Sequence, residues 1–467
     1  MIPGFAPFAT RMRADGLPPA VIETFAHYYA QLCAGAAGKV SQAEIDPVDD
    51  LPDAAALAGC RGAGTEALAR AVVIKLNGGL GTSMGMTRAK SVLPAKAGLS
   101  FLDIIVRQTL HLRRVHHCRL PLVLMNSFRS REDSRRVLDR YPELASAVPA
   151  DFLQHRVPRI LKADRTPVDW PRDREHEWCP PGHGDIYLAL ETSGMLRTLL
   201  EAGFQYAFVS KADNLGAVLD PDILGWFAGE RLSFLMEVVD RTEADRKGGH
   251  LARLKDGRLM LREVAQCPDD ELDAFQDVRR YRYFNANNLW VDLRALADLL
   301  RARGGVLGLP MIVNEKPVDP EDPGSPRVVQ LETAMGAAIA VFAGARALHV
   351  PRTRLVPVKT TSDLLALWSD AYELAEDFRV VASPARRLGT LVVDLDPQVY
   401  RTVQDLEMRF PTGAPSLVRC RRLVVRGDVR FAAGVVVEGD VEVRQDGPAP
   451  RTIPAGTRLT GAGAGGR

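Results

Sequence analysis

The feature that most constrains this chain is a short apolar run that ends in a glycine-rich turn. Residues 71–76 read Ala-Val-Val-Ile-Lys-Leu and are rich in β-branched side chains, as expected of a buried strand in a parallel sheet. Asn-Gly-Gly-Leu-Gly-Thr-Ser-Met-Gly follows at once over residues 77–85. Because glycine has no Cβ and tolerates positive φ, backbone N–H groups in such a turn can approach an anionic ligand closely. The sequence therefore predicts a phosphate-binding turn after a buried strand.

The turn matches neither of two common nucleotide motifs. The dinucleotide fingerprint Gly-x-Gly-x-x-Gly fails because, counted from Gly79 and Gly81, Met84 takes the place of the third glycine. The P-loop fails because Ala89 replaces the glycine that must precede its Lys-Ser pair. Lys90 can still place a cation beside a phosphate, although a lysine on a solvent-facing loop would look the same in the sequence. We therefore expect a phosphate loop of another kind.

Length and composition exclude several classes of protein. A chain of 467 residues indicates two or three domains, and 46% apolar with 25% charged residues is typical of a soluble globular protein. The net charge of +2 provides no basic field for nucleic acid, and no apolar stretch is long enough to span a membrane. The first residues contain prolines where a secretory signal needs a continuous apolar segment. Six cysteines without metal-ligand spacing indicate reduced thiols, so we predict a cytoplasmic protein.

The order of the chain predicts a central domain between two different flanks. Residues 1–70 are expected to form a helical segment with a flexible join, including a helix that starts at Pro18-Pro19. Strands and helices alternate over residues 71–387, which predicts a parallel or mixed sheet with helices on both faces. Short alternating strands with Gly-Asp turns predict stacked β-helix coils over 388–460, and the Gly/Ala-rich residues 461–467 are expected to be disordered.

Within the central domain the pattern predicts further elements. Buried strands are expected at 121–127, 205–210 and 232–239, and a late strand at 355–359. Ser100 and Asp103 resemble a capping box for a helix that runs to about residue 117. Ser130 is expected to start a charged helix that ends near residue 141, and Thr361 or Ser362 to cap a helix after the late strand.

Two polar turns are the stronger further site candidates. Pro180-Pro-Gly-His-Gly-Asp185 presents His183 between glycines just before a predicted helix, an arrangement that favours anion binding. Asp213 follows a buried strand, where an open α/β sheet binds its ligand, and one carboxylate with substrate phosphates is enough to hold Mg²⁺. The alternatives are a surface histidine and a simple Asx turn at Asp213-Asn214.

Three weaker candidates are polar residues in turns or at a strand end. Lys247-Gly-Gly249 and Asn285-Ala-Asn-Asn288 have the amides and open backbone that bind sugar hydroxyls, but each signal is weak alone. Lys359, at the end of the late strand, is a second candidate phosphate cation, although a lone lysine in such a place is usually solvated.

At these residues the chain resembles the eukaryotic-type UTP–glucose-1-phosphate uridylyltransferases. The resemblance implies an α/β fold, with a Rossmann-like nucleotidyltransferase domain built on a mixed sheet and a C-terminal left-handed β-helix. The matching stretches are collinear; they are 76–85 with Lys90-Ser91, 121–128, 156–160, 180–187, 213–216, 247–249, 285–290, 330–338 and 357–364.

The resemblance also implies a role for each matching residue. The backbone of Leu76, Asn77, Gly78 and Gly79 would hold the uridine and its phosphates. Gln154 and Gly182 would read the uracil, and Lys90 and Lys359 would neutralise the phosphates from two sides. Asp213 would hold Mg²⁺ and His183 would meet the sugar phosphate. The hexose contacts would be Gly249, Asn285, Asn287 and Asn288.

Two departures from the family pattern stand out. Lys211 occupies a position where relatives commonly carry asparagine, two residues before the metal aspartate and within reach of the nucleotide. An extra cation there can strengthen phosphate binding or change which sugar phosphate is accepted. The chain also stops in Gly/Ala soon after the predicted β-helix, without the last strand-like segment of longer relatives. Octamers in the family assemble through that end, so the sequence leaves open whether a homo-oligomer forms through the C-terminal domain.

The residues and the resemblance together predict a Mg²⁺-dependent enzyme that converts UTP and glucose 1-phosphate to UDP-glucose and pyrophosphate. Because the attacking phosphate is already anionic, positioning and charge neutralisation should dominate, and no strong base is needed. The nearest alternative is the same reaction with another sugar 1-phosphate, such as that of galactose or N-acetylglucosamine, or with several. A nucleotide-sugar-binding regulator without turnover is a second alternative. A nicotinamide-dependent dehydrogenase is the third and is disfavoured by the broken fingerprint.

Overall fold

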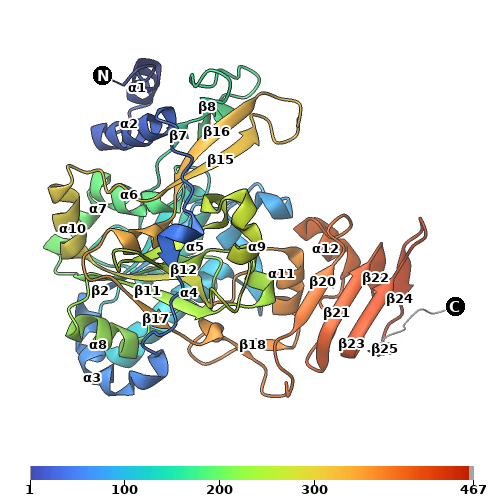
Figure 1. Ribbon diagram of the computed structural model, residues 1–467. Helices are drawn as coiled ribbons and strands as arrows, with labels where there is room; N and C mark the ends of the chain where they lie inside the picture. The colour runs from blue at the N-terminus through green and yellow to red at the C-terminus, as the bar shows by residue number, and fades with distance from the viewer. Residues whose placement is uncertain (1, 462–467) are drawn as a thin grey trace.

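The structure, a computed structural model, describes residues 2–461 and is built around a ten-stranded mixed sheet (Figure 1). The main path of hydrogen-bonded strands runs in the order β1 (Ile45–Asp46), β12 (His250–Leu254), β14 (Tyr283–Asp292), β10 (Tyr206–Lys211), β2 (Ala71–Asn77), β5 (Leu122–Asn126) and β6 (Asp151–Leu153). The remaining three strands are β11 (Phe234–Asp240), which pairs with β14, β17 (Arg346–His349), which pairs with β11, and β13 (Leu259–Arg262), which pairs with β12.

The middle of the sheet is parallel and covered on both faces. β10, β2, β5 and β6 run parallel to one another, while β14 is antiparallel to β10. Alternate residues of β2 enter two separate hydrophobic clusters: Val73 packs in the cluster that contains α4, and Ile74 in the cluster that contains α6 and α7. The predicted strands at 71–76, 121–127, 205–210 and 232–239 are all confirmed.

Helices flank this sheet with the starts that the sequence predicts. The Ser100 hydroxyl accepts the Asp103 N–H (3.1 Å) and the Asp103 carboxylate accepts the Ser100 N–H (2.9 Å), so the predicted capping box is present. The predicted charged helix begins one residue after Ser130 and ends at Leu138, three residues earlier than expected. The helices are α3 (Arg61–Ala67), α4 (Phe101–His116), α5 (Arg131–Leu138), α6 (Ile186–Thr192), α7 (Met195–Glu201), α8 (Pro221–Gly229), α9 (Leu272–Phe275), α10 (Leu293–Ala302) and α11 (Thr361–Trp368).

The first seventy residues are less separate than the sequence suggested. Their two helices, α1 (Ala6–Ala14) and α2 (Pro19–Cys33), lie apart from the sheet at the top of Figure 1, and α2 starts where predicted. Residues 45–46, however, form β1, which pairs with β12 at the edge of the central sheet. The central sheet therefore includes two residues that come before the predicted boundary at residue 70.

The predicted late strand at 355–359 is wrong. This segment makes only an isolated bridge, between Asn214 and Pro357. Its N–H groups bond to the turn after β10 instead: Val356 donates to Asn214 Oδ1 (2.9 Å) and Val358 to the Asp213 carbonyl (3.1 Å). Pro357 has no N–H to donate to a ladder, which explains why no strand forms. The following helix α11 is capped by Thr360 rather than by Thr361 or Ser362.

Short sheets surround the central one. The largest pairs β15 (Met311–Pro317) with β16 (Arg327–Thr333), and β16 also pairs with β8 (Ile160–Leu161). The two-stranded sheets are β7 (Val157–Pro158) with β9 (Trp178–Cys179), β3 (Pro94–Lys96) with β4 (Leu99–Ser100), and β18 (Tyr372–Leu374) with β19 (Val380–Ala382).

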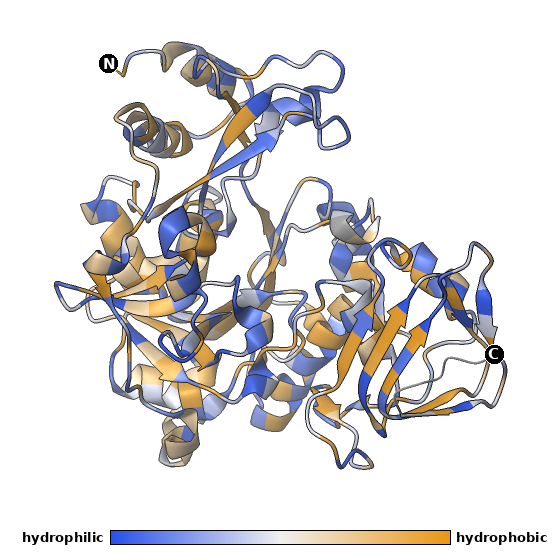
Figure 2. Ribbon diagram, turned by 45° about the vertical axis from the view of Figure 1, so that its right-hand side comes forward, coloured by the Kyte–Doolittle hydropathy of each residue, from blue (hydrophilic) through white to orange (hydrophobic). Residues whose placement is uncertain are grey.

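The C-terminal part consists of short strands stacked in parallel, seen in orange to red in Figure 1. Helix α12 (Val403–Arg409) lies beside them. Apolar and polar residues alternate along these strands (Figure 2), and residues 423–443 show the inward apolar positions that the sequence predicted. One sheet contains β20 (Val392–Leu395), β21 (Cys420–Arg426), β23 (Val436–Arg444) and β25 (Arg458–Thr460); the other contains β22 (Val429–Phe431) and β24 (Arg451–Ile453).

Three further sequence predictions concern the chain as a whole. All six cysteines are free thiols. None of the helices within residues 2–461 has the length and apolar character needed to cross a bilayer. The predicted disordered tail falls, except for Gly461, outside the described residues.

Candidate active site

The glycine-rich turn folds back on the end of β2. Gly81 has φ +61°, a left-handed conformation that glycine adopts without strain, and the Lys90 N–H donates to the Gly79 carbonyl (3.1 Å). A Cβ on Gly78 would lie 2.5 Å from Gln154 Oε1, so the absence of a side chain lets the Gln154 amide lie against the backbone. The turn thus places Lys90 and Gln154 at the same strand end.

An open cavity of about 330 Å³ lies at the carboxyl ends of β2, β5 and β10. It is the position at which open α/β sheets bind ligands. The lining residues to which the sequence assigned no role are Ser91, Met125, Pro180 and Ala212. The cavity brings together most of the predicted site residues: Leu76, Asn77, Gly78, Gly79, Lys90, Gln154, Gly182, His183, Lys211 and Asp213.

Two of the three predicted catalytic groups are in direct contact. Lys90 Nζ donates to Asp213 Oδ2 (3.1 Å) and also to the Val358 carbonyl. The Val358 N–H in turn donates to the Asp213 carbonyl (3.1 Å), so Val358 is hydrogen-bonded to both Lys90 and Asp213. Lys359 follows Val358 directly, so the backbone places it beside the pair. Its side chain is exposed at the rim and does not line the cavity.

His183 is held as a neutral hydrogen-bond donor. The Met335 N–H donates to His183 Nδ1 (2.9 Å), which assigns the ring proton of the neutral form to Nε2. Burial lowers the pKa of His183 well below its usual value, and the Lys211 ammonium lowers it further. The Nε2–H group is therefore available to a ligand oxygen at neutral pH.

Gly182 and Gln154 are fixed by neighbouring strands. Gly182 has φ +82°, and a Cβ there would lie 2.4 Å from the Thr333 carbonyl, so only glycine fits against β16. The Gln154 N–H donates to the Asn126 carbonyl at the end of β5 (2.9 Å). The two residues expected to contact uracil thus line the same cavity.

Lys211, which lines the cavity, interacts electrostatically with the buried Glu263. Burial lowers the pKa of Lys211, while the nearby carboxylates of Asp213 and Glu263 raise it. Burial likewise raises the pKa of Glu263, and the ammonium groups of Lys211 and Lys359 lower it. A Cβ on Gly249 would lie 2.7 Å from the Glu263 carboxyl group, so this glycine makes room for Glu263. Sequence reasoning missed Glu263, because an isolated glutamate after β13 carries no motif; its only signal was Gly249.

The three predicted hexose asparagines divide into two groups. Asn285 and Asn287 bond to each other: the Asn287 N–H donates to Asn285 Oδ1 (2.8 Å), and Asn287 has φ +55°. Asn287 is partly exposed. Asn288 is fully buried, and its Nδ2 donates to Glu237 Oε2 (2.9 Å) and to the Arg354 carbonyl (3.1 Å). Its side chain is therefore directed into the protein, and we do not retain it as a sugar contact.

A buried polar network that the sequence did not reveal lies beneath the Asp213 turn. Glu237 has no exposed surface and accepts hydrogen bonds from Trp290 Nε1 (2.9 Å) and from Arg354 Nε (2.7 Å) and Nη2 (2.6 Å). Asn214, next to Asp213, donates to the Arg354 carbonyl (3.0 Å). The network therefore joins β11 and β14 to the two segments that carry Asp213 and Lys359.

The one carboxylate among the residues that line the cavity, Asp213, suits a metal ion shared with a ligand. Within residues 2–461 no group of three or more His, Cys, Asp or Glu side chains is arranged to hold a metal ion. Asp213 Oδ2 instead faces one cation, the Lys90 ammonium. A single carboxylate at a cavity edge fits Mg²⁺, which usually keeps several waters and takes further ligands from substrate phosphates.

The fold and the site together define an α/β protein with a nucleotide cavity equipped for phosphate chemistry. A family model described as UTP–glucose-1-phosphate uridylyltransferase matches residues 22–438. The chain therefore belongs to the UTP–glucose-1-phosphate uridylyltransferase family. Among curated relatives, the barley (Hordeum vulgare) enzyme of that name is 41% identical over 84% of this chain and 81% of its own length. A Dictyostelium discoideum relative, UTP–glucose-1-phosphate uridylyltransferase 2, is 36% identical over 85% of this chain and 77% of its own.

Solved structures show the same likeness over nearly the whole chain. A mutant of Leishmania major UDP-glucose pyrophosphorylase, in complex with UDP-glucose, superimposes with a TM-score of 0.91 at 42% identity and covers 99% of each chain. A UDP-glucose phosphorylase from Trypanosoma brucei gives a TM-score of 0.90 at 42% identity, with 98% and 99% of the two chains covered. The resemblance predicted from the motifs is thus confirmed.

Proposed function

We propose that this protein catalyses the reversible reaction of UTP with glucose 1-phosphate to give UDP-glucose and pyrophosphate. An oxygen of the sugar phosphate forms a bond to the α-phosphorus, and the bond from that phosphorus to the bridging oxygen breaks. The electron pair leaves with pyrophosphate. The observation that carries the proposal is the meeting of Lys90 and Asp213 beneath the glycine-rich turn, in a chain of this family.

The residues of the cavity divide this work between them. The backbone at Leu76–Gly79 and the Gln154 amide are placed to bind uridine, and Lys90 and Lys359 to neutralise its phosphates from two sides. His183 donates from Nε2 to the sugar phosphate. Glu263 and Asn287 are placed to accept or donate hydrogen bonds to hexose hydroxyls, beside Gly249. Two anions are brought together, so positioning and charge neutralisation supply most of the rate enhancement.

Asp213 is the group that would hold Mg²⁺. When bound, Mg²⁺ supplies positive charge to the phosphates of UTP. The present contact between Lys90 and Asp213 (3.1 Å) holds the carboxylate at the cavity edge. Release of Lys90 from Asp213 leaves its ammonium group free to bind a phosphate oxygen.

The test is pyrophosphate release from a panel of nucleotides and sugars. UTP, ATP, dTTP and GTP are combined with the 1-phosphates of glucose, galactose and N-acetylglucosamine, with and without Mg²⁺. We expect the highest kcat/KM for UTP with glucose 1-phosphate, and no turnover in EDTA. A higher value for another sugar would favour a UDP-sugar pyrophosphorylase of different or broader range. Nucleotide binding without pyrophosphate release would instead indicate a regulator.

We also propose three properties of the whole protein. The C-terminal coils form a left-handed β-helix, supported by the parallel registers of β20, β21, β23 and β25. The protein is cytoplasmic, supported by its free cysteines. A homo-oligomer through the C-terminal coils is open to a direct test by light scattering, in which a single monomer mass would reject it.

A further inference from the structure

Helix α5 lines no part of the active-site cavity, yet it contacts three segments that do. We propose that α5 is a positioning element, which fixes the nucleotide half of the site through Asp133, Ser134 and the Arg131–Asp151–Arg135 cluster. This inference rests on the proposed function, because it assigns these residues to UTP binding. It is carried by three separate contacts.

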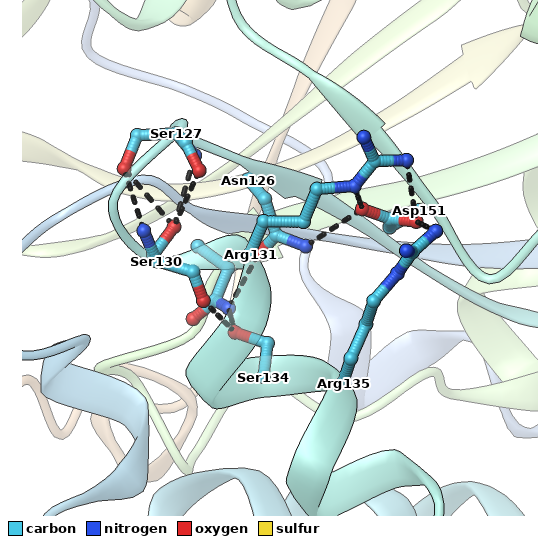
Figure 3. A network of polar contacts seen from close by, with 8 residues as sticks. Asn126, Ser127, Ser130, Arg131, Ser134, Arg135 and Asp151 are labelled. Carbon is cyan, nitrogen blue, oxygen red and sulfur yellow. Dashed lines mark hydrogen bonds and ion pairs between the residues drawn. The ribbon is translucent and has the colours of Figure 1, made fainter.

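The first contact turns Asn77 away from the ligand. Asn77 Nδ2 donates to Ser134 Oγ on α5 (2.6 Å) and to Asn126 Oδ1 at the end of β5 (2.8 Å). Ser134 is itself held by the Ser130 carbonyl, to which its hydroxyl donates (2.7 Å). Figure 3 shows Ser134 and Asn126 within the same network of polar contacts as Ser130. These bonds fix the Asn77 side chain through its amide nitrogen, so the peptide at this residue, which lines the cavity, is held in place.

The second contact holds the segment that leads to the catalytic lysine. Asp133 Oδ2 accepts the Ala89 N–H (3.2 Å), and Oδ1 accepts from Arg88 Nη2 (3.1 Å). Ala89 directly precedes Lys90, so the bond fixes the peptide from which the lysine side chain starts. Loss of this bond would free Lys90 to leave the end of β2.

The third contact fixes the start of β6, three residues before Gln154. Arg131 Nε donates to Asp151 Oδ2 (2.6 Å), and Arg135 Nη2 donates to Oδ1 (3.3 Å). Asn126 Nδ2 also donates to Asp151 (3.2 Å), so the carboxylate joins β5, β6 and the helix, as Figure 3 shows. The carboxylate is nearly buried while both arginines reach solvent, so the pairs are screened by salt less than a fully exposed pair would be.

The sugar half of the site has no such dependence on α5. Gly249, Asn287 and Glu263 lie at the start of β12, on β14 and after β13. In the order of the sheet, β10 and β2 separate these strands from β5 and β6. A disturbance at α5 should therefore weaken UTP binding and spare the binding of hexose 1-phosphate.

The experiment compares Ser134→Ala, Asp151→Asn and Asp133→Asn with Glu132→Gln as the matched control. Glu132 lies on the same helix but forms its ion pair with Arg136 on the exposed side. Initial rates give kcat and both KM values, and calorimetry of the folded proteins with UTP gives Kd without turnover. Ser134→Ala and Asp151→Asn should raise the KM and Kd of UTP at least fivefold, with the KM of glucose 1-phosphate unchanged within twofold. Asp133→Asn should lower kcat at least tenfold, and Glu132→Gln should change nothing beyond twofold.

The proposal would be overturned if the KM and Kd of UTP stayed within twofold of wild type in both Ser134→Ala and Asp151→Asn. Equal increases in the KM of UTP and the KM of glucose 1-phosphate would also overturn it. Because Asp151→Asn can fail to fold, Ser134→Ala, which removes a single hydroxyl, is sufficient for the test. If the proposed function itself is wrong, the wild-type protein will bind UTP without releasing pyrophosphate. The comparison of Kd values for UTP would then still decide the role of α5.

Discussion

The contact between Lys90 and Asp213 makes each residue the other's counter-ion before substrates arrive. The lysine ammonium sits on the carboxylate that is proposed to hold Mg²⁺, so the negative charge of Asp213 is never left uncompensated at the cavity edge. If Asp213 held Mg²⁺, as proposed, the ion would be a second cation beside the Lys90 ammonium. At the scale of single residues, the charge of Asp213 is thus already matched by one cation before any ligand binds.

Removal of either partner should affect the chemical step. Lys90→Ala and Asp213→Ala are each expected to lower kcat by two or more orders of magnitude, about 3 kcal/mol of transition-state stabilisation. Pyrophosphate release at saturating UTP and Mg²⁺ measures the effect. Lys255→Ala, which removes an exposed lysine paired with Asp46, is the control. A variant at Lys90 or Asp213 with near wild-type kcat would exclude that residue from the mechanism.

Lys211 should act on the sugar phosphate or on sugar choice. The carboxylates of Asp213 and Glu263 are near enough to its ammonium group to raise the pKa of Lys211, against the larger lowering by burial. We expect Lys211→Asn to raise the KM of glucose 1-phosphate about tenfold, because a charge-assisted hydrogen bond contributes about 1.5–3 kcal/mol. The same panel of sugar 1-phosphates, run on both proteins, detects any change of preference. Identical KM values and preferences would leave Lys211 without a role in this reaction.

Lys75 gives a prediction about pH. It is buried in β2, and burial lowers its pKa to about 7, while its Nζ donates to Ser210 Oγ and the Ala217 carbonyl (both 2.7 Å). Between pH 7 and 10 the unfolded chain therefore binds a proton that the folded protein does not. Stability should rise with pH in that window by up to about 1.4 kcal/mol per pH unit, and this contribution is constant below pH 7.

The measurement is urea denaturation of wild type and Lys75→Met from pH 6 to 9. Methionine cannot titrate, so the difference in unfolding free energy between the two proteins should shift in favour of the wild type above pH 7. A difference that stays constant over this range would mean that Lys75 keeps its proton in the folded protein.

At the scale of elements, the sequence predicted the strands that are mainly apolar and missed those that are richer in polar residues. β2, β5, β10 and β11 were recognised although β2 contains Lys75 and β11 contains Glu237. The short β12 and β13 were missed, and the expected polar turn at 285–288 is wrong, because these asparagines lie within β14. The proximity of Lys90 and Asp213 was predictable because both follow parallel strands. The place of Glu263 beside the site was not predictable, because the residues around it come from segments that are distant in the sequence. The direction of Asn288 depends on the buried carboxylate of Glu237, which no local pattern reveals.

The buried network beneath the Asp213 turn should affect stability and turnover together. In Glu237→Gln, Arg354 would remain buried without its bidentate carboxylate, at a cost of about 3–5 kcal/mol in unfolding free energy. The Arg354 carbonyl binds Asn214, so we also expect a lower kcat. Urea denaturation and pyrophosphate release measure the two effects. Glu243→Gln, at an exposed pair with Arg246, should change stability by less than about 1 kcal/mol; a similar loss there would contradict the argument from burial.

At the scale of the molecule, the C-terminal part touches two segments that lead to the site. A Cβ on Gly85, in the glycine-rich turn, would lie 2.6 Å from Thr402 Cγ2 at the cap of α12. The Leu395 N–H donates to Ser362 Oγ in the first turn of α11 (3.1 Å), and the Thr361 hydroxyl donates to the Tyr400 carbonyl. The coils therefore support the turn that leads to Lys90 and the helix that follows Lys359.

Gly85→Ala tests this contact between the two parts. Gly85 has φ +71° and Gly98 has φ +74°, but a Cβ on Gly98 meets nothing within 4 Å. Gly98→Ala should therefore lower the free energy of unfolding only by the backbone strain, about 1–2 kcal/mol. Gly85→Ala should lower it further and also raise the KM of UTP. Thr402→Ser, which removes the nearest methyl group and keeps the capping hydroxyl, should restore part of the loss. Equal losses of stability in the two glycine variants would show that Thr402 leaves room for a Cβ at residue 85.

β1 has a consequence for any attempt to isolate the catalytic part. Residues 45–46 close the border of the central sheet by pairing with β12, whose first residue follows Gly249. A shortened protein that started at residue 71 would leave the outer backbone groups of β12 open to solvent and to the same strand of a second molecule. Such a fragment would be prone to self-association through Arg253 and Leu254, the two residues of β12 that β1 covers.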